Sequence, residues 1–399
     1  MEYYYFKEMS TWTMDDEKVE VVENNEHLGL VVSGEREEEK NIDDRLRKGR
    51  GSLFSLLGPA FAQKCLLSPN VKMHLFRLRT CPIVRCGLSS MVIRQTQHSP
   101  MQVFQRKCLK SFLSLSERSS TAGIHFLLGE LPLQGRIDRD VFSLFYNIWC
   151  NKETKIYQIV KYLLENSPSN SRTWSMHVKS LAEKYKLPSP STLLEQEPMT
   201  KHSYKSMIMG KIIHFYENYL KEKASVDDNL KYFNVSDLHL NGKSHPVIGG
   251  ITTTSQAKEI RPLIKMLLND YYTYEKRSIF SGGTLSPHCR LPECQASGEF
   301  VENVKHILTQ CLSTARVRDN MLTHFLDAIK VSKPNFNFTL FSENKDLLVQ
   351  SILDPLSQNL PSDMRIAAKD DNIENILRVS RQLVNSIHCE RLRLLKMIQ

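Results

Sequence analysis

The stretch Ser99–Leu113, SPMQVFQRKCLKSFL, decides the fold class. Ser99 followed by Pro100 is a typical helix start, because Pro suits the first turn, where its missing N–H would have no partner. Basic side chains then occupy one side of the expected helix, and apolar side chains recur on the other at a helical spacing. The basic residues are Arg106, Lys107 and Lys110, and the apolar residues are Val103, Phe104, Cys108, Leu109, Phe112 and Leu113.

Similar patterns on both sides of this stretch predict a mainly α protein with a short β-hairpin near the N-terminus. Two valine-rich runs, Lys18–Val22 and Leu28–Val32, are separated by Glu23-Asn24-Asn25, which predicts the hairpin. After Gly34 the spacing becomes helical, and Gly49, Gly51, Gly58 and Pro59 are expected to end that helix. Further helices are expected from about Thr121 and over 133–150, 200–224, 256–275 and 374–396.

The net charge of +9 is unevenly distributed. Residues 1–40 hold 4 basic and 12 acidic side chains, whereas residues 41–139 hold 16 basic and 5 acidic ones. A concentrated block of Lys and Arg is typical of a protein that binds a polyanion, although solvated faces of a helical domain give the same composition.

Motifs for several classes of enzyme and for membrane insertion are missing from the sequence. It has no G-x-x-x-x-G-K phosphate loop, no G-x-S-x-G elbow and no H-E-x-x-H helix. Asp15-Asp16 follows a polar segment and is interpreted as part of an acidic tail, because a two-metal polymerase site needs carboxylates between apolar strands. No apolar run approaches the roughly 18 residues of a membrane span, and Met1–Met9 has no apolar signal region. We therefore expect an intracellular protein, nuclear or cytoplasmic and not secreted, without membrane or small-molecule partners.

A cluster of cysteine and histidine is the sharpest motif. Cys289, Cys294, His306 and Cys311 have the spacing C-x4-C-x11-H-x4-C, four ligand-type residues within 23 positions. Zinc is held by four such ligands at the corners of a tetrahedron. The pattern predicts a zinc site, with His288 as a spare candidate and buried free cysteines as the alternative interpretation. The remaining cysteines are expected to be small core residues: Cys65, Cys81, Cys86, Cys108, Cys150 and Cys389.

Several segments, taken in order, resemble the region after the palm in non-LTR retrotransposon reverse transcriptases. The segment 27–32, HLGLVV, resembles the end of the palm, and 49–58, GRGSLFSLLG, resembles the first thumb helix. The segment 105–110, QRKCLK, resembles the second thumb helix, and 127–133, LLGELPL, the step that follows it. Ser171–Ser175 and the cysteine–histidine cluster are similar to the tail, although the family usually has two residues between the first cysteines.

The resemblance implies a role in nucleic-acid binding without polymerisation. Thumb helices in that family follow the RNA–DNA duplex, so an RNA or an RNA–DNA duplex is the implied partner, and the palm with its catalytic aspartates is missing. The implied phosphate contacts are Arg45, Arg47, Lys48, Arg50, Arg106, Lys107 and Lys110. The expected organisation is an acidic tail and hairpin (1–34), a basic helical thumb (35–150), a helical connector (151–275), a zinc knuckle (276–315) and a C-terminal helical domain (316–399). Two alternatives remain open, an adaptor that uses zinc only to fold and an inert translated fragment.

Overall fold

A computed structural model describes residues 13–14, 17–18, 22, 24–27, 29–33, 36–62, 67–168, 170–298, 300–334, 336, 338–362, 364–367 and 369–398. These residues form helices α1–α17 and two short antiparallel hairpins, so the predicted mainly α fold is confirmed. The predictions for Cys65, Asp15 and Asp16 fall outside the described residues. No helix in the described part of the chain combines the length and apolar character that a membrane span requires.

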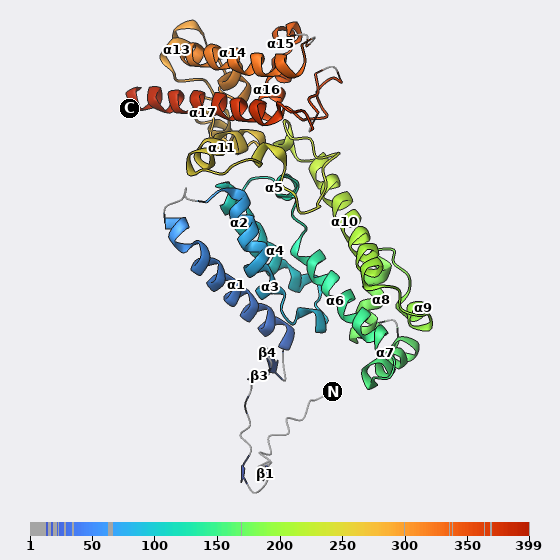
Figure 1. The fold of residues 1–399 in the computed structure, drawn as a ribbon. Coiled ribbons are helices and arrows are strands. Elements are labelled where there is room, and N and C mark those ends of the chain that lie inside the picture. Colours follow the sequence, from blue (N-terminus) through green and yellow to red (C-terminus); the bar gives the residue numbers. More distant parts are fainter. Residues whose placement is uncertain are drawn as a thin grey trace.

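The first group of helices packs around α4, which is the helix predicted from the opening stretch (Figure 1). Its predicted apolar face is buried at Phe104, Cys108 and Phe112, while Val103 lies at the edge of that face and is only half-buried. Helix α6 has the predicted bounds of 133–150. The bounds in this group are α1 (Glu37–Ala62), α2 (Pro69–Leu75), α3 (Cys81–Arg85), α4 (His98–Leu113), α5 (Thr121–Leu128) and α6 (Leu133–Cys150).

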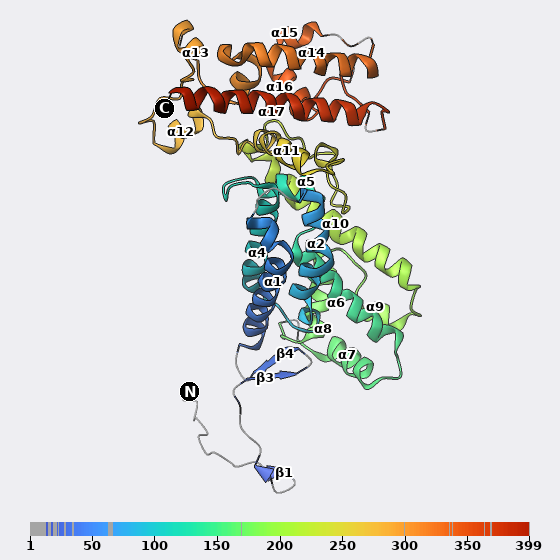
Figure 2. The same cartoon turned by 60° about the vertical axis from the view of Figure 1, so that its left-hand side comes forward.

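The long helix α10 connects this group to the C-terminal helices, and the short helices α7, α8 and α9 cluster beside its N-terminal half (Figure 1). Near the C-terminus, α17 packs against α11 on one side and against α14 and α16 on the other (Figures 1 and 2). The bounds are α7 (Lys155–Asn166), α8 (Trp174–Lys184), α9 (Pro190–Glu195), α10 (Lys201–Ser225), α11 (Thr254–Leu267), α12 (Tyr274–Phe280), α13 (Pro292–Ser297), α14 (Ala315–Ser332), α15 (Thr339–Glu343), α16 (Lys345–Leu353) and α17 (Ile373–Ile398).

A hairpin is present near the N-terminus, but its predicted bounds are wrong. Strands β3 (Asn24–His27) and β4 (Leu30–Ser33) pair, so Asn24 and Asn25 lie in a strand and not in the turn. The turn contains Gly29 at φ +80°, a conformation that only glycine adopts without strain. Two further strands, β1 (Thr13–Met14) and β2 (Glu17–Lys18), pair with each other.

Helix α1 does not end at its glycines, contrary to the expectation. It runs through Gly49, Gly51 and Gly58 to Ala62. A Cβ atom at position 49 would lie 2.4 Å from Cγ2 of Val84 on α3, so glycine is needed there for the two helices to approach closely. Packing against α3 therefore accounts for the glycine at position 49, whereas a Cβ atom at position 51 or 58 would meet nothing within 4 Å.

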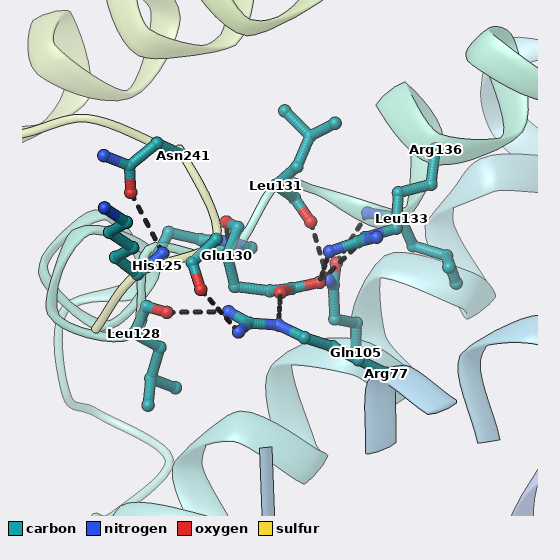
Figure 3. Close-up of polar contacts among 11 residues, drawn as sticks. Arg77, Gln105, His125, Leu128, Glu130, Leu131, Leu133, Arg136 and Asn241 are labelled. Carbon is teal, nitrogen blue, oxygen red and sulfur yellow. Dashed lines mark hydrogen bonds and ion pairs between the residues drawn. The ribbon is translucent and has the colours of Figure 1, made fainter. Parts of the chain in front are cut away.

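The segment between α5 and α6 is built around a buried carboxylate (Figure 3). Glu130 is fully buried, and its carboxylate accepts hydrogen bonds from Nε of Arg77 at 2.7 Å and from Arg136 at 2.8 Å. The side chain of Gln105 on α4 bonds to the backbone just before α6 at 3.0 Å and to the first N–H of α6 at 2.7 Å. This junction fixes α4 and α6 relative to each other.

Candidate metal centre

Four side chains from separate turns of the chain meet at the end of the molecule where α12 and α13 lie beside the C-terminus (Figure 2). They are Cys289, Cys294, His306 and Cys311, and each is at most 4% exposed. Their potential ligand atoms all lie within 4.8 Å of one another, so this buried cluster can hold a metal ion. The sequence motif is therefore assembled in space.

Two distances inside the cluster, both from Cys294, match a tetrahedral thiolate and imidazole site. Sγ of Cys294 lies 3.7 Å from Sγ of Cys311 and 3.7 Å from Nε2 of His306. Ligands at about 2.3 Å (sulfur) and about 2.0–2.1 Å (nitrogen) from a tetrahedral ion would be separated by about 3.8 Å for two sulfurs and about 3.5 Å for sulfur and nitrogen. An ion can thus enter with small shifts of these atoms.

The first ligand is placed by a short antiparallel bridge. The backbone of His288 pairs with that of Val301, and the N–H of Cys289 donates to the carbonyl of Phe300 at 2.8 Å. The N–H of Glu302 donates to the carbonyl of Pro287 at 2.9 Å on the other side of the bridge. This bridge fixes the backbone of Cys289 without help from a metal.

The second ligand lies on α13, a helix of six residues that begins with Pro292. Four residues between the first two cysteines allow Cys294 to lie within this helical turn, where it is fully buried. The backbone N–H of Leu312 donates to Sγ of Cys294 at 3.3 Å, and the N–H of Glu293 donates to Oγ of Ser313 at 3.2 Å. The hydrogen bond from the N–H of Leu312 stabilises negative charge on Sγ of Cys294.

His306 begins a π-helical turn, His306–Gln310, and Cys311 follows directly after it. The N–H of Cys311 donates to the carbonyl of His306 at 2.8 Å, so the wider turn returns the chain to the same site. The imidazole stacks on Phe300, with ring centroids 5.7 Å apart and an interplanar angle of 26°. Single π-helical turns are frequent at functional sites, because they redirect a side chain within a helix.

The thiols perturb one another because they are close together and buried. The hydrogen bond from Cys289 lowers the pKa of Cys311 to about 3, and the same contact raises the pKa of Cys289. Burial raises the pKa of Cys294, against the effect of its backbone donors. A bound cation would favour deprotonation of all three thiols.

The C-terminal helix closes the site. Leu394 and Leu395 of α17 pack against the cysteines, which form a small core of their own. Arg391, about one turn earlier, is paired with the buried carboxylate of Glu302, with Nη2 2.6 Å from Oε1 and Nε 3.3 Å from Oε2. Oε1 also accepts from the backbone N–H of Tyr274 at 3.1 Å. Sequence reasoning missed this ion pair, since its partners are 89 residues apart and no motif links them.

Other predictions for cysteine and histidine are only partly confirmed. His288 is not part of the metal-ligand cluster, and its Nδ1 lies 3.1 Å from Oγ of Ser286. Cys81 and Cys108 are buried, as expected for core residues. The expectation is wrong for Cys86, Cys150 and Cys389, which are exposed. Cys86 and Cys150 lie where helices end, and a helix end can leave an apolar pattern unburied.

Two of the seven predicted phosphate contacts are engaged inside the protein. Arg45 is 5% exposed and donates to the carbonyl of Gly29, which holds the hairpin turn on α1. Lys110 is 3% exposed, and its Nζ lies 2.5 Å from the carbonyl oxygen of Glu117. The charged groups of Arg45 and Lys110 therefore bind backbone carbonyl groups within the protein and are not available to a phosphate.

Two more of the predicted contacts are neutralised at the surface. Arg47 is paired with Asp44 at 2.6 Å, and Lys48 is paired with Asp44 at 2.8 Å and with Glu26 at 3.0 Å. Burial alone would raise the pKa of Asp44, but the hydrogen bonds from Lys48 and Arg47 outweigh it and lower that pKa. The carboxylate of Asp44 therefore remains ionised and keeps both pairs intact at neutral pH.

The remaining three basic residues face two different hollows. Arg50 on α1 and Lys107 on α4 line one groove of about 930 Å³, which we call the α1–α4 groove. Neither residue forms an ion pair with a carboxylate of the described chain. Phe54, which is 66% exposed, lies in the same groove. Arg106 lines a separate pocket on the side of α4 that faces α10.

Comparison with protein-family models, with curated proteins and with solved structures found no match for this chain.

Proposed function

We propose that this protein binds zinc and nucleic acid in the manner of the region that follows the palm in non-LTR retrotransposon reverse transcriptases. The observation that carries the proposal is the buried group of three thiols and one imidazole, with its ligand atoms within 4.8 Å of one another. The resemblance of the sequence motifs supplies the nucleic-acid partner, an RNA or an RNA–DNA duplex.

The chemistry of the donors favours zinc over harder cations. Thiolate and imidazole are the usual ligands of structural zinc, whereas magnesium and calcium take oxygen ligands. Four protein ligands leave no open position, so the ion would contribute to folding and not to a reaction.

The α1–α4 groove is the best candidate for contact with a nucleic-acid backbone. Arg50 and Lys107 reach it from two helices, and neither is paired with a carboxylate of the described residues. Arg and Lys bind phosphate without reading sequence, and such binding weakens as added salt reduces the gain from counterion release. Phe54 adds an exposed ring beside the two cations.

Binding of a fluorescent RNA–DNA duplex across a salt series tests this part of the proposal. We expect Lys107→Gln and Arg50→Gln each to weaken binding and to reduce the salt slope by about 0.9 per lost phosphate contact. Lys155→Gln, an exposed lysine at the start of α7, is the matched control and should leave binding unchanged. A salt-independent response, or an equal effect of all three variants, would reject the groove as the binding surface.

The second candidate function is an adaptor in which zinc only stabilises the fold. It is favoured by the burial of the cluster beneath Leu394 and Leu395, because a closed site of this kind joins two parts of the chain. Zinc binding together with no affinity for the duplex at low salt would select this alternative.

A further inference from the structure

Two of the candidate metal ligands can also form a covalent bond with each other. Sγ of Cys294 lies 3.7 Å from Sγ of Cys311. We propose that a peroxide oxidises this pair to a disulfide, which removes two of the four ligands and releases the metal. The inference rests on the proposed zinc site and adds its regulation, because the metal is held only while both thiols are reduced.

The two sulfur atoms need to move little for the bond to form. A disulfide bond is about 2.05 Å long, so the sulfurs must approach each other from 3.7 Å to about that distance. Rotation about the Cα–Cβ bonds supplies such a movement without a change of fold. The separation that suits two ligands of one metal ion therefore also suits two partners in a disulfide.

The backbone holds these two cysteines side by side. The N–H of Leu312, the residue after Cys311, donates to Sγ of Cys294 at 3.3 Å. The N–H of Glu293, the residue before Cys294, donates to Oγ of Ser313 at 3.2 Å. Helix α13 and the chain after the π-helical turn are thus joined at two points, and neither contact is made through a metal.

Cys289 is the competing partner, because its thiol is hydrogen-bonded to that of Cys311. Its backbone N–H, however, donates to the carbonyl of Phe300, and its neighbour His288 pairs with Val301. These bonds join Cys289 to the segment before the π-helical turn and not to the segment after it. Cys294 is therefore the expected partner of Cys311.

One molecule of hydrogen peroxide balances the oxidation. The first thiolate attacks one peroxide oxygen, which breaks the O–O bond, gives a sulfenic acid and releases hydroxide. The second thiolate attacks that sulfur, which forms the S–S bond and releases a second hydroxide. Two protons from the solvent convert both hydroxides to water. The two remaining ligands, Cys289 and His306, are half of the four that a structural zinc site requires.

The last turn of α17 controls access to the thiols. Leu394 and Leu395 pack against the cysteines, which are at most 4% exposed. Met397, close to the end of the helix, is 72% exposed. Helix ends open locally at a small cost in free energy, so a short-lived opening of this turn admits a molecule as small as hydrogen peroxide.

A peptide map of the full chain after treatment with hydrogen peroxide tests the pairing. Trypsin places each cluster thiol in a peptide of its own: Cys289 in 278–290, Cys294 in 291–305 and Cys311 in 306–316. After free thiols are alkylated, we expect a link between 291–305 and 306–316, with one zinc released to a chelating dye for each link. Dithiothreitol should reverse the link and restore zinc binding.

The zinc content before oxidation separates this inference from the proposed function. A purified chain without zinc contradicts the zinc site, but the peptide map still tests the pair, because a disulfide needs no metal. A zinc-loaded chain that keeps its zinc in a tenfold excess of peroxide, or that links Cys289 to either partner, overturns the inference and leaves the zinc site standing.

Substitutions identify the reacting thiols. Cys289→Ser should still form the link between 291–305 and 306–316, even if it binds zinc poorly, whereas Cys294→Ser should lose it. Cys389→Ser, which removes an exposed thiol outside the cluster, is the matched control and should release zinc like wild type. Loss of the link in Cys289→Ser, or zinc release that depends on Cys389, would contradict the assigned pair.

Two leucines of α17 test the route of access. Leu395→Ala should be oxidised roughly tenfold faster than wild type, because the truncation removes packing that keeps the last turn closed. Leu392→Ala is the matched control, since Leu392 is 41% exposed, and it should react at the wild-type rate. Equal rates for the two variants would overturn the role assigned to the last turn.

Discussion

Replacing Glu302 by Gln should destabilise the protein strongly, because it leaves a buried arginine without its counter-ion. The side chains of Glu302 and Arg391 are 0% and 4% exposed, and they are joined by contacts of 2.6 and 3.3 Å. Removing one partner of a buried pair costs about 3–5 kcal/mol, since the remaining charge keeps its desolvation penalty. We expect Glu302→Gln to lower the free energy of unfolding by that amount.

Urea denaturation followed by circular dichroism measures this change, and the same helix provides the control. Glu390 and Arg393 also form a 2.6 Å pair, but their side chains are 22% and 58% exposed, so Glu390→Gln should have a much smaller effect. The double variant Glu302→Gln/Arg391→Met should be more stable than the sum of the single losses predicts. Equal losses for Glu302→Gln and Glu390→Gln would refute the argument that burial makes the first pair critical.

Three further predictions concern stability. Gly129→Ala should lower the free energy of unfolding by at least about 1–3 kcal/mol, because φ is +58° and the new Cβ would lie 2.0 Å from the carbonyl oxygen of Lys243. Gly210→Ala, inside α10 with open space around it, should instead raise the free energy of unfolding by about 0.5–1 kcal/mol. Thermal melts of the two variants compare these effects. Burial lowers the pKa of His98 to about 4 from an ordinary value of 6.5, so the unfolded chain takes up the proton first. His98 alone should therefore remove about 3 kcal/mol from the free energy of unfolding between pH 6.5 and 4, and His98→Gln should reduce the pH dependence by that amount in pH-dependent denaturation. A zinc chelator should lower the melting temperature of wild type but not that of Cys294→Ser, and a chelator effect of equal size on both proteins would contradict the site.

The fold was predictable where a helix shows both faces in its sequence. The stretch 99–113 and the range 133–150 have clear apolar spacing, and both form helices close to the predicted bounds. The continuation of α1 past Gly49 was not predictable, because the sequence does not reveal that Val84 packs closely against this glycine. The register of the hairpin was not predictable, because a turn could be expected at Glu23-Asn24-Asn25 or at Gly29. The structure has the turn at Gly29, which adopts a positive φ of +80°.

The candidate metal ligands were predictable from their spacing, whereas the basic surface was not. Three thiols and an imidazole within 23 positions indicate a metal site through their order along the chain alone. Whether a basic side chain is buried or remains free to bind phosphate depends on its neighbours in space, which the sequence does not show. Arg45 and Arg50 belong to the same basic stretch, yet one is buried against the hairpin and the other lines the α1–α4 groove.

Zinc content and X-ray absorption at the zinc edge, measured on the purified full chain, test the central claim most directly. We expect one zinc per chain, bound by three sulfur atoms at about 2.3 Å and one nitrogen at about 2.0–2.1 Å. A chain that retains no zinc, or a spectrum dominated by oxygen ligands, would contradict the proposal that Cys289, Cys294, His306 and Cys311 form a zinc site.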